Sequence, residues 1–118
     1  MIQQDYVYNG QIINVVDGDT CDIKIDLGFY VYIHERMRLN GIDTAELNST
    51  DPGLRKLAQD AKAWLAAYSG RSITLKSYKK DKFGRFLVDI FLPGETESLN
   101  SKLLSLGLAK PYDGGARV

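Results

Sequence analysis

Three short runs hold the side chains of this chain that are best suited to chemistry. They are Asp-Gly-Asp-Thr at 17–20, Arg-Leu-Asn-Gly-Ile-Asp-Thr-Ala-Glu at 38–46 and Asp-Lys-Phe-Gly-Arg at 81–85. Carboxylate oxygens are the ligands that hard cations such as calcium prefer, and guanidinium groups hold phosphate oxygens in pairs. Together, such groups suit metal-assisted hydrolysis of a phosphodiester. If the fold brings the three runs together, the sequence predicts a protein that cuts nucleic acid.

The carboxylates of these runs lie where a metal site and its water could form. Asp19 follows a glycine turn at the start of an expected strand, and Asp43 and Thr44 lie at the end of another. If these strand ends meet at one rim, two carboxylates, a backbone carbonyl and several waters can surround one cation. Glu46, three residues beyond Asp43, can orient or deprotonate an attacking water. This arrangement is typical of an open catalytic site.

The arginines of the same runs are suited to phosphate. Arg38 and Arg85 can each donate paired N–H groups, and their hold on phosphate should tighten as charge builds in the transition state. Each run also has an ordinary interpretation, because Asp-Gly-Asp-Thr is a common turn and Asp-Lys-Phe-Gly-Arg suits a hairpin tip. The hypothesis of a functional site rests on all three runs occurring together.

The overall composition is that of an ordinary globular domain. The chain has 118 residues, of which 44% are apolar and 25% charged, and 15 basic side chains balance 15 acidic ones. We therefore expect a single domain over 1–118, with its core at about 10–112 and a loose C-terminal tail. A zero net charge does not itself indicate a nucleic-acid binder. However, five basic side chains lie within 76–85 against one aspartate, which makes a local basic patch.

Several classes of site and location are disfavoured by what the chain contains. The single Cys21 allows no intrachain disulfide or thiolate zinc cluster, and its place in an alternating strand predicts burial. The single His34 excludes histidine-rich metal sites. The N-terminus has no signal-peptide pattern, and no run has transmembrane length. We expect a cytoplasmic protein rather than a mature secreted form, without a membrane partner.

The hydrophobic pattern predicts strands first and then alternates with helices. Strands are expected at 11–16, 21–27 and 29–39, with Phe29, Val31, Ile33, Met37 and Leu39 sharing one face. A helix should begin at Thr50-Asp51-Pro52 and end at Gly70. Strands follow at 72–78 and 86–92, and then a short helix at 97–106 with Leu99, Leu103 and Leu106 facing inward.

This order matches a known architecture. Five antiparallel strands, with a helix between the third and fourth and a short C-terminal helix, are expected to form an OB-type Greek-key β-barrel. An open sheet of the same content remains an alternative, because periodicity does not show closure.

At this level of detail the chain resembles the staphylococcal nuclease (thermonuclease) family, an OB-fold family of calcium-dependent phosphodiesterases. The match runs from about Gly10 to Tyr112. It rests on Val-Val-Asp-Gly-Asp-Thr, Arg-Leu-x-Gly-Ile-Asp-Thr-x-Glu, Asp-Lys-Phe-Gly-Arg and the Leu-x-x-Gly-Leu-Ala-Lys run at 104–110. The resemblance implies a monomeric nuclease that hydrolyses DNA and RNA with little sequence preference and leaves 3′-phosphates.

The resemblance also implies a role for individual residues. One calcium ion per chain would be held by the carboxylates of Asp19 and Asp43 and the backbone carbonyl of Thr44; magnesium or manganese could occupy a similar oxygen site. Glu46 would direct the water. Arg38 and Arg85 would bind and stabilise the phosphate. Additional substrate contacts are expected from three residues, Lys82, Phe83 and Tyr112.

Departures from the family pattern keep a second function open. Ala45 stands where a proline is frequent, Phe83 replaces a frequent tyrosine, and the loop 48–53 carries few charges. A third, C-terminal helix of many members is not expected here. The main alternative is a catalytically weak or inactive OB module that binds nucleic acid or protein, with a structural adaptor as a third option. The complete set of carboxylates and arginines favours the enzyme.

Overall fold

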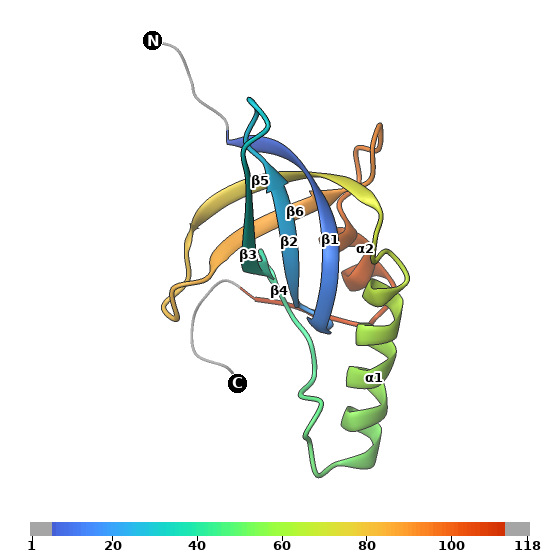
Figure 1. Cartoon of the computed structure of the whole chain (residues 1–118). Coiled ribbons are helices and arrows are strands. Elements are labelled where there is room, and N and C mark those ends of the chain that lie inside the picture. The colour runs from blue at the N-terminus through green and yellow to red at the C-terminus, as the bar shows by residue number, and fades with distance from the viewer. Residues whose placement is uncertain (1–5, 113–118) are drawn as a thin grey trace.

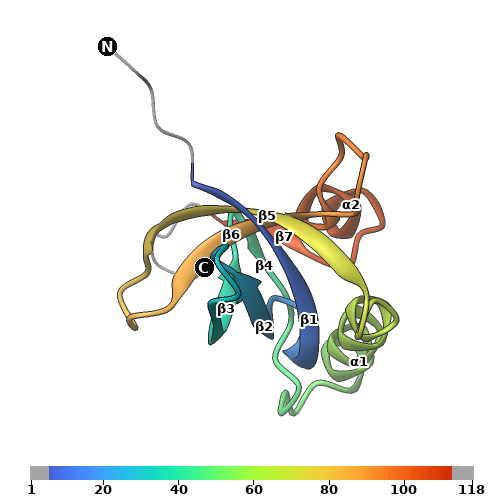
Figure 2. The same ribbon diagram turned by 45° about the horizontal axis from the view of Figure 1, so that its top comes forward.

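The computed structural model describes residues 6–112 and has a closed barrel at its centre (Figure 1). The barrel strands are β1 (Val7–Asp17), β2 (Thr20–Asp26), β3 (Tyr32–Leu39), β5 (Ser72–Lys80) and β6 (Phe86–Phe91), in the spatial order β1-β2-β3-β6-β5. Two helices, α1 (Pro52–Ala66) and α2 (Leu99–Ser105), lie outside it. Figure 2 shows both helices on the same side of the barrel. The predicted OB-type barrel with helices is therefore confirmed.

One strand pair differs from the expected all-antiparallel arrangement. β3 and β6 are parallel, with Met37 opposite Phe86 and Leu39 opposite Val88. The other neighbouring pairs of the barrel are antiparallel. Strand direction cannot alternate around a closed ring of five strands, so at least one pair must be parallel. The chain leaves β3, passes through α1 and returns in β5 and β6. The parallel pair is the one at which β6 closes the barrel against β3.

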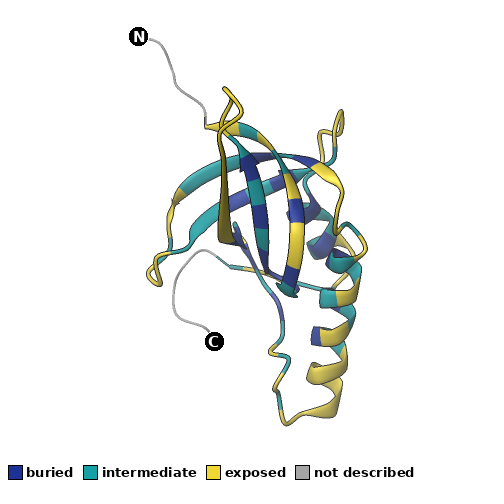
Figure 3. Cartoon of the chain, viewed as in Figure 1, coloured by how far each residue is buried: buried dark blue, intermediate teal, exposed yellow. Residues whose placement is uncertain are grey.

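The core fills the barrel and extends beneath the helices (Figure 3). In β2, Cys21, Ile23 and Ile25 point inward, as the alternation predicts. Burial is the main reason why the pKa of the Cys21 thiol is raised to about 12, so this side chain packs as a small hydrophobe. From outside, α1 contributes Leu65 and α2 contributes Leu103, both fully buried.

Both helices begin at the capping residues that their sequences supply. The Asp51 carboxylate accepts hydrogen bonds from the backbone N–H groups of Gly53 and Leu54, at 2.8 and 3.1 Å. The Ser98 hydroxyl accepts one from the backbone of Ser101 at 3.0 Å. The helix predicted at 97–106 is shorter, and Leu106 is 57% exposed rather than inward, because α2 ends before it.

The predicted strand at 29–39 begins later than expected. Phe29 and Tyr30 form a turn with positive φ, and Phe29, Val31 and Ile33 are exposed instead of sharing a buried face with Met37. The hairpin of β2 and β3 continues beyond the barrel, so no opposite strand covers this part of its inner face (Figure 3).

A second small sheet was missed by the hydrophobic pattern. β4 (Ile42–Asp43) pairs antiparallel with β7 (Lys110–Pro111), and the Tyr112 N–H donates to the Gly41 carbonyl at 2.9 Å. Two-residue strands are too short to show a period. β7 therefore lies at the end of the expected core, and the expected loose tail, 113–118, lies outside the described residues.

Candidate functional site

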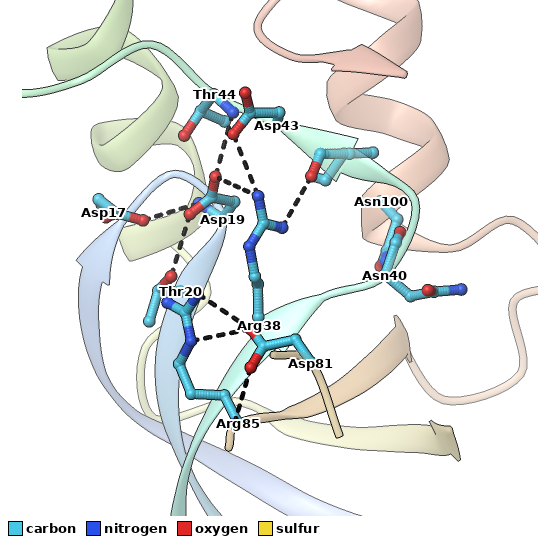
Figure 4. Close-up of polar contacts among 11 residues, drawn as sticks. Asp17, Asp19, Thr20, Arg38, Asn40, Asp43, Thr44, Asp81, Arg85 and Asn100 are labelled. Atoms are coloured by element: carbon cyan, nitrogen blue, oxygen red, sulfur yellow. Dashed lines mark hydrogen bonds and ion pairs between the residues drawn. The ribbon is translucent and has the colours of Figure 1, made fainter. Parts of the chain in front are cut away.

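The first two motifs meet at one rim of the barrel, around a buried arginine (Figure 4). The Arg38 side chain, at the end of β3, is only 6% exposed. Its Nη2 lies 3.1 Å from Asp43 Oδ1 and 3.6 Å from Asp19 Oδ2. Its Nη1 donates to the Ile42 carbonyl at 3.0 Å. One guanidinium thus contacts both carboxylates that the sequence assigns to a metal.

Backbone contacts hold the β1–β2 turn against this rim. The Asp17 carboxylate accepts a hydrogen bond from the Asp19 N–H at 3.0 Å, which shapes the turn. The Asp19 carbonyl accepts from the Leu39 N–H at 2.8 Å and ties the turn to β3. A Cβ on Gly18 would lie 2.6 Å from Ala61 Cβ, so glycine is needed here for the close approach of α1.

The Asp19 carboxylate is buried but well supplied with donors. Its Oδ2 accepts from the Thr44 N–H at 3.1 Å, and its Oδ1 accepts from the Thr20 hydroxyl at 3.0 Å. Burial alone would raise the pKa of Asp19, but these hydrogen bonds, the contact with Asp17 and the charge of Arg38 outweigh it and lower the pKa. Burial and the neighbouring Asp19 raise the pKa of Asp17 to about 6.

The donor chemistry of this rim fits a hard cation held at an open position. Two carboxylates and the Thr44 carbonyl are oxygen ligands of the kind that calcium accepts, and a set this small leaves coordination positions for water or phosphate. Within residues 6–112, no group of three or more His, Cys, Asp or Glu side chains is arranged to hold a metal ion. A cation here would therefore depend on few protein ligands and would lie beside Arg38.

The third motif forms the tip between β5 and β6, where Asp81 organises the turn. Its Oδ1 accepts from the backbone N–H groups of Phe83 and Arg85, both at 2.9 Å. Its Oδ2 lies 2.9 Å from Arg85 Nη2 and accepts from Nε at 3.0 Å. Burial raises the pKa of Asp81, but these donors and the arginine charge outweigh it and lower the pKa.

Sequence reasoning missed this role of Asp81. Arg85 does not extend alone from the tip but is held by a neighbouring carboxylate. The signal was present, because an aspartate four residues before an arginine, across the left-handed Gly84 (φ 82°), can fold back onto it. Figure 4 shows Arg85 in the same close-up as Arg38, on the adjoining part of the barrel.

The remaining predicted residues lie in two places. Tyr112 reaches the rim, with the Arg38 Cζ 4.9 Å from its ring centroid. Phe83 is 72% exposed at the β5–β6 tip, where Lys82 Nζ lies 5.4 Å and Arg85 Cζ 5.5 Å from its ring centroid. Glu46 is exposed on the loop after β4, and its carbonyl accepts from the Ser49 N–H at 3.1 Å.

A buried amide that the sequence reasoning did not single out supports the rim from below. The Asn100 side chain accepts from the Ile90 N–H at 3.2 Å and donates to the carbonyls of Asn40 and Val88, at 2.9 and 3.0 Å. It therefore links α2 to β6 and to the chain just after Arg38. The sequence signal that could have indicated this role is the position of the Asn100 amide directly after Leu99, which is predicted to face inward.

Comparison with known proteins places the chain in a family. Residues 36–116 match the family model described as staphylococcal nuclease homologue. The chain belongs to this family. The matched segment includes Arg38, Asp43, Glu46 and Arg85, whereas Asp19 lies before it. Membership is consistent with the barrel and indicates a nuclease-type fold.

The chain is also similar to an uncharacterised protein of Methanocaldococcus jannaschii. The two are 27% identical over 89% of this chain and 59% of the archaeal protein. The chain therefore spans less than two thirds of that relative, and the relative's description assigns no activity.

Proposed function

We propose that this domain is a calcium-dependent nuclease that hydrolyses phosphodiester bonds of DNA and RNA. The observation that carries the proposal is the convergence of Asp19 and Asp43 on Arg38, with Nη2–oxygen distances of 3.6 and 3.1 Å. Carboxylates for a hard cation and a guanidinium for phosphate then lie side by side at one rim.

Asp19, Asp43 and the Thr44 carbonyl are the residues that would hold the metal. Calcium bound there would supply positive charge to the scissile phosphate and help to position water. The hydrogen bonds from Thr20 and from the Thr44 N–H fix the Asp19 carboxylate in place. A fixed carboxylate loses little conformational freedom when a ligand arrives.

The two arginines would bind the phosphate and neutralise its developing charge. Arg38 is buried and already aligned by the Ile42 carbonyl, while Arg85 is aligned by Asp81. Such preorganised donors are most effective where charge increases in the transition state. The exposed ring of Phe83 and the ring of Tyr112 offer faces on which bases can stack.

Glu46 is the proposed general base. It would take a proton from water as the water oxygen attacks phosphorus in line with the leaving group. Breaking the bond from phosphorus to the 5′-oxygen leaves a 3′-phosphate, and the departing oxygen takes up a proton to become a 5′-hydroxyl. The exposed loop position of Glu46 allows solvent water to reach it.

The experiment is digestion of single-stranded DNA and of RNA with calcium or with a chelator. We expect chelator-sensitive cleavage, a fall in turnover of about 100-fold or more for Glu46→Gln, and loss of calcium-dependent cleavage for Asp19→Asn. Arg36→Met is a control for loss of a charge near the site, because Arg36 lies on β3 two residues before Arg38 but pairs with Asp22 on the barrel's outer surface. Parental turnover in Glu46→Gln, or cleavage in the chelator, would overturn the proposed mechanism.

The rival proposal is a module that binds nucleic acid without cutting it. The observation that favours it is the direct contact of Arg38 with Asp19 and Asp43, which satisfies the charges of both carboxylates within the protein without a metal ion. Retention of intact single-stranded DNA in the presence of calcium would support binding without catalysis.

A further inference from the structure

The end of the barrel away from Asp19, Arg38 and Asp43 carries an unusual amount of exposed apolar surface. Eight of the twelve exposed large hydrophobic side chains within residues 6–112 lie there: Tyr6, Val7, Leu27, Phe29, Tyr30, Val31, Tyr32 and Ile33. They come from the start of β1 and the hairpin of β2 and β3, which project together at the top of Figure 1. β2 separates this end from Thr20 at the candidate site by about 20 Å.

The tip of the hairpin displays two aromatic rings that bury almost nothing. Phe29 is 98% exposed and Tyr30 is 94% exposed. Both have positive φ, 57° and 60°, in a turn closed by hydrogen bonds between Leu27 and Val31 and between Val31 and Gly28. Asparagine and glycine adopt this backbone readily, whereas bulky side chains do so at a cost. Folding alone does not account for aromatic rings in this turn.

An apolar groove opens beside the tip. It has a volume of about 500 Å³ and runs between the hairpin and the end of β5. Its lining includes Leu27 and Ile33 from the hairpin, Tyr6 from before β1, and Phe86 from β6. The tip and the groove therefore form one apolar end, and contiguous exposed apolar surface commonly marks a binding site.

Lysines border this apolar end. Lys24 Nζ lies 4.5 Å from the ring centroid of Tyr32, Lys76 is the strand partner of Val7, and Lys79 lines the groove. The carboxylates nearby are Asp26, which accepts from the Gly28 N–H at 2.8 Å, Glu35 on β3, Asp89, which is the strand partner of Lys76, and Glu95, which lines a hollow with Val7 and Lys76. Apolar side chains at the tip with cationic ones behind them match the order of hydrocarbon and anionic headgroups in a membrane.

We propose that this end docks on an anionic lipid bilayer, with Phe29 and Tyr30 inserted at the interface and the lysines against the headgroups. A second copy of the chain fits less well. A two-fold interface would place the bordering lysines of one copy against the same lysines of the other, and their charges would repel. Nucleic acid fits less well too, since the aliphatic groove would leave the polar edges of bases unpaired. A bilayer fits better, because it can take up the protruding tip without a pocket of complementary shape.

Docking would be peripheral. Neither helix within residues 6–112 is long and apolar enough to cross a membrane. The sequence predicts no membrane partner, because no run has transmembrane length. The hairpin changes that expectation, because Phe29, Val31 and Ile33, predicted to share one face of a strand, are exposed. The proposal does not rest on the proposed nuclease activity, and it can be tested in a chelator.

The test is co-sedimentation of the full chain with phosphatidylglycerol–phosphatidylcholine vesicles and with pure phosphatidylcholine vesicles. We expect binding to the anionic vesicles that weakens with salt, and a loss of about tenfold or more in Phe29→Ser/Tyr30→Ser. Leu106→Ser removes an exposed apolar side chain elsewhere and should bind normally. Lys24→Gln/Lys76→Gln should bind the anionic vesicles no better than it binds pure phosphatidylcholine vesicles.

Three outcomes would overturn the proposal. The first is no sedimentation with either vesicle, and the second is equal binding by the parent and the double aromatic variant. The third is that the aromatic variant has lost a different interaction instead. Sedimentation equilibrium would show a loss of self-association, and titration with single-stranded DNA in a chelator would show a loss of DNA binding. Urea unfolding of each variant separates a lost contact from a lost fold, because tip side chains this exposed should contribute little to stability.

Discussion

Replacing Arg38 with methionine should convert the candidate metal site into a destabilising cluster of charge. Methionine keeps much of the side-chain length, but it removes the cation 3.1 Å from Asp43 and 3.6 Å from Asp19. It also leaves the Ile42 carbonyl without its 3.0 Å donor. Breaking a buried ion pair by removing one partner costs about 3–5 kcal/mol. Because Asp43 is 19% exposed, the lower end, about 3 kcal/mol, is expected.

Calcium should recover part of this loss, because a cation between the two carboxylates replaces the missing positive charge. A ligand at about 100 times its dissociation constant stabilises the folded state by about 2.7 kcal/mol. The gain from calcium should therefore be larger in Arg38→Met than in the parent, where the guanidinium already lies against Asp19 and Asp43.

The assay is urea unfolding followed by the fluorescence of Trp64, the single tryptophan, with calcium or with a chelator. Arg36→Met is the control on the same strand: its side chain is 57% exposed, so losing its pair with Asp22 should change stability by less than about 1 kcal/mol. Arg38→Lys, which keeps the charge, should lie between parent and Arg38→Met. Equal stabilities of the two methionine variants, or equal calcium gains in Arg38→Met and the parent, would refute the reasoning.

Three other perturbations test the surrounding structure. Gly18→Ala should destabilise the domain by about 2 kcal/mol and weaken calcium binding, because its Cβ would lie 2.6 Å from Ala61 Cβ and 2.9 Å from Thr44 Cγ2; unfolding and calcium titration measure both effects. Asn100→Ala should cost about 3 kcal/mol in urea unfolding, because it leaves the buried Ile90 N–H unpaired. The pKa of Tyr78 is raised to about 12, chiefly by its hydrogen bond to Asp89. The protonated phenol is therefore favoured by folding, and its contribution is complete below the unfolded pKa of about 10 and lost as pH rises to about 12; Tyr78→Phe should lose less stability over that range.

Local sequence signals predicted the elements that carry their own periodicity or caps. The alternation of Cys21, Ile23 and Ile25 predicted a half-buried strand, and Asp51-Pro52 predicted the start of α1; both are confirmed. These signals depend on neighbours within a few residues, which is why they can be read without the fold.

Features set by distant parts of the chain were not predicted. The parallel pairing of Met37 with Phe86 follows from closing five strands into a ring, and no local pattern reports closure. Phe29 and Val31 continue an apolar alternation, so they read as a buried strand, although the hairpin extends past the barrel and leaves them exposed. The period of a strand shows which side chains share a face but not whether anything covers that face.

The same limit applies to the site, where the residues were predicted but their mutual contacts were not. From the sequence, Arg38 is predicted to bind phosphate, and Asp19 and Asp43 are predicted to bind a metal ion, as if these residues acted separately. The structure joins them through one guanidinium nitrogen. Arg38 can therefore stabilise the metal-free protein, and phosphate would compete with Asp43 for the same donors. A buried charge this close to two carboxylates would make the proposed substrate binding, the proposed cation binding and folding stability interdependent, so each must be measured with the other two held fixed.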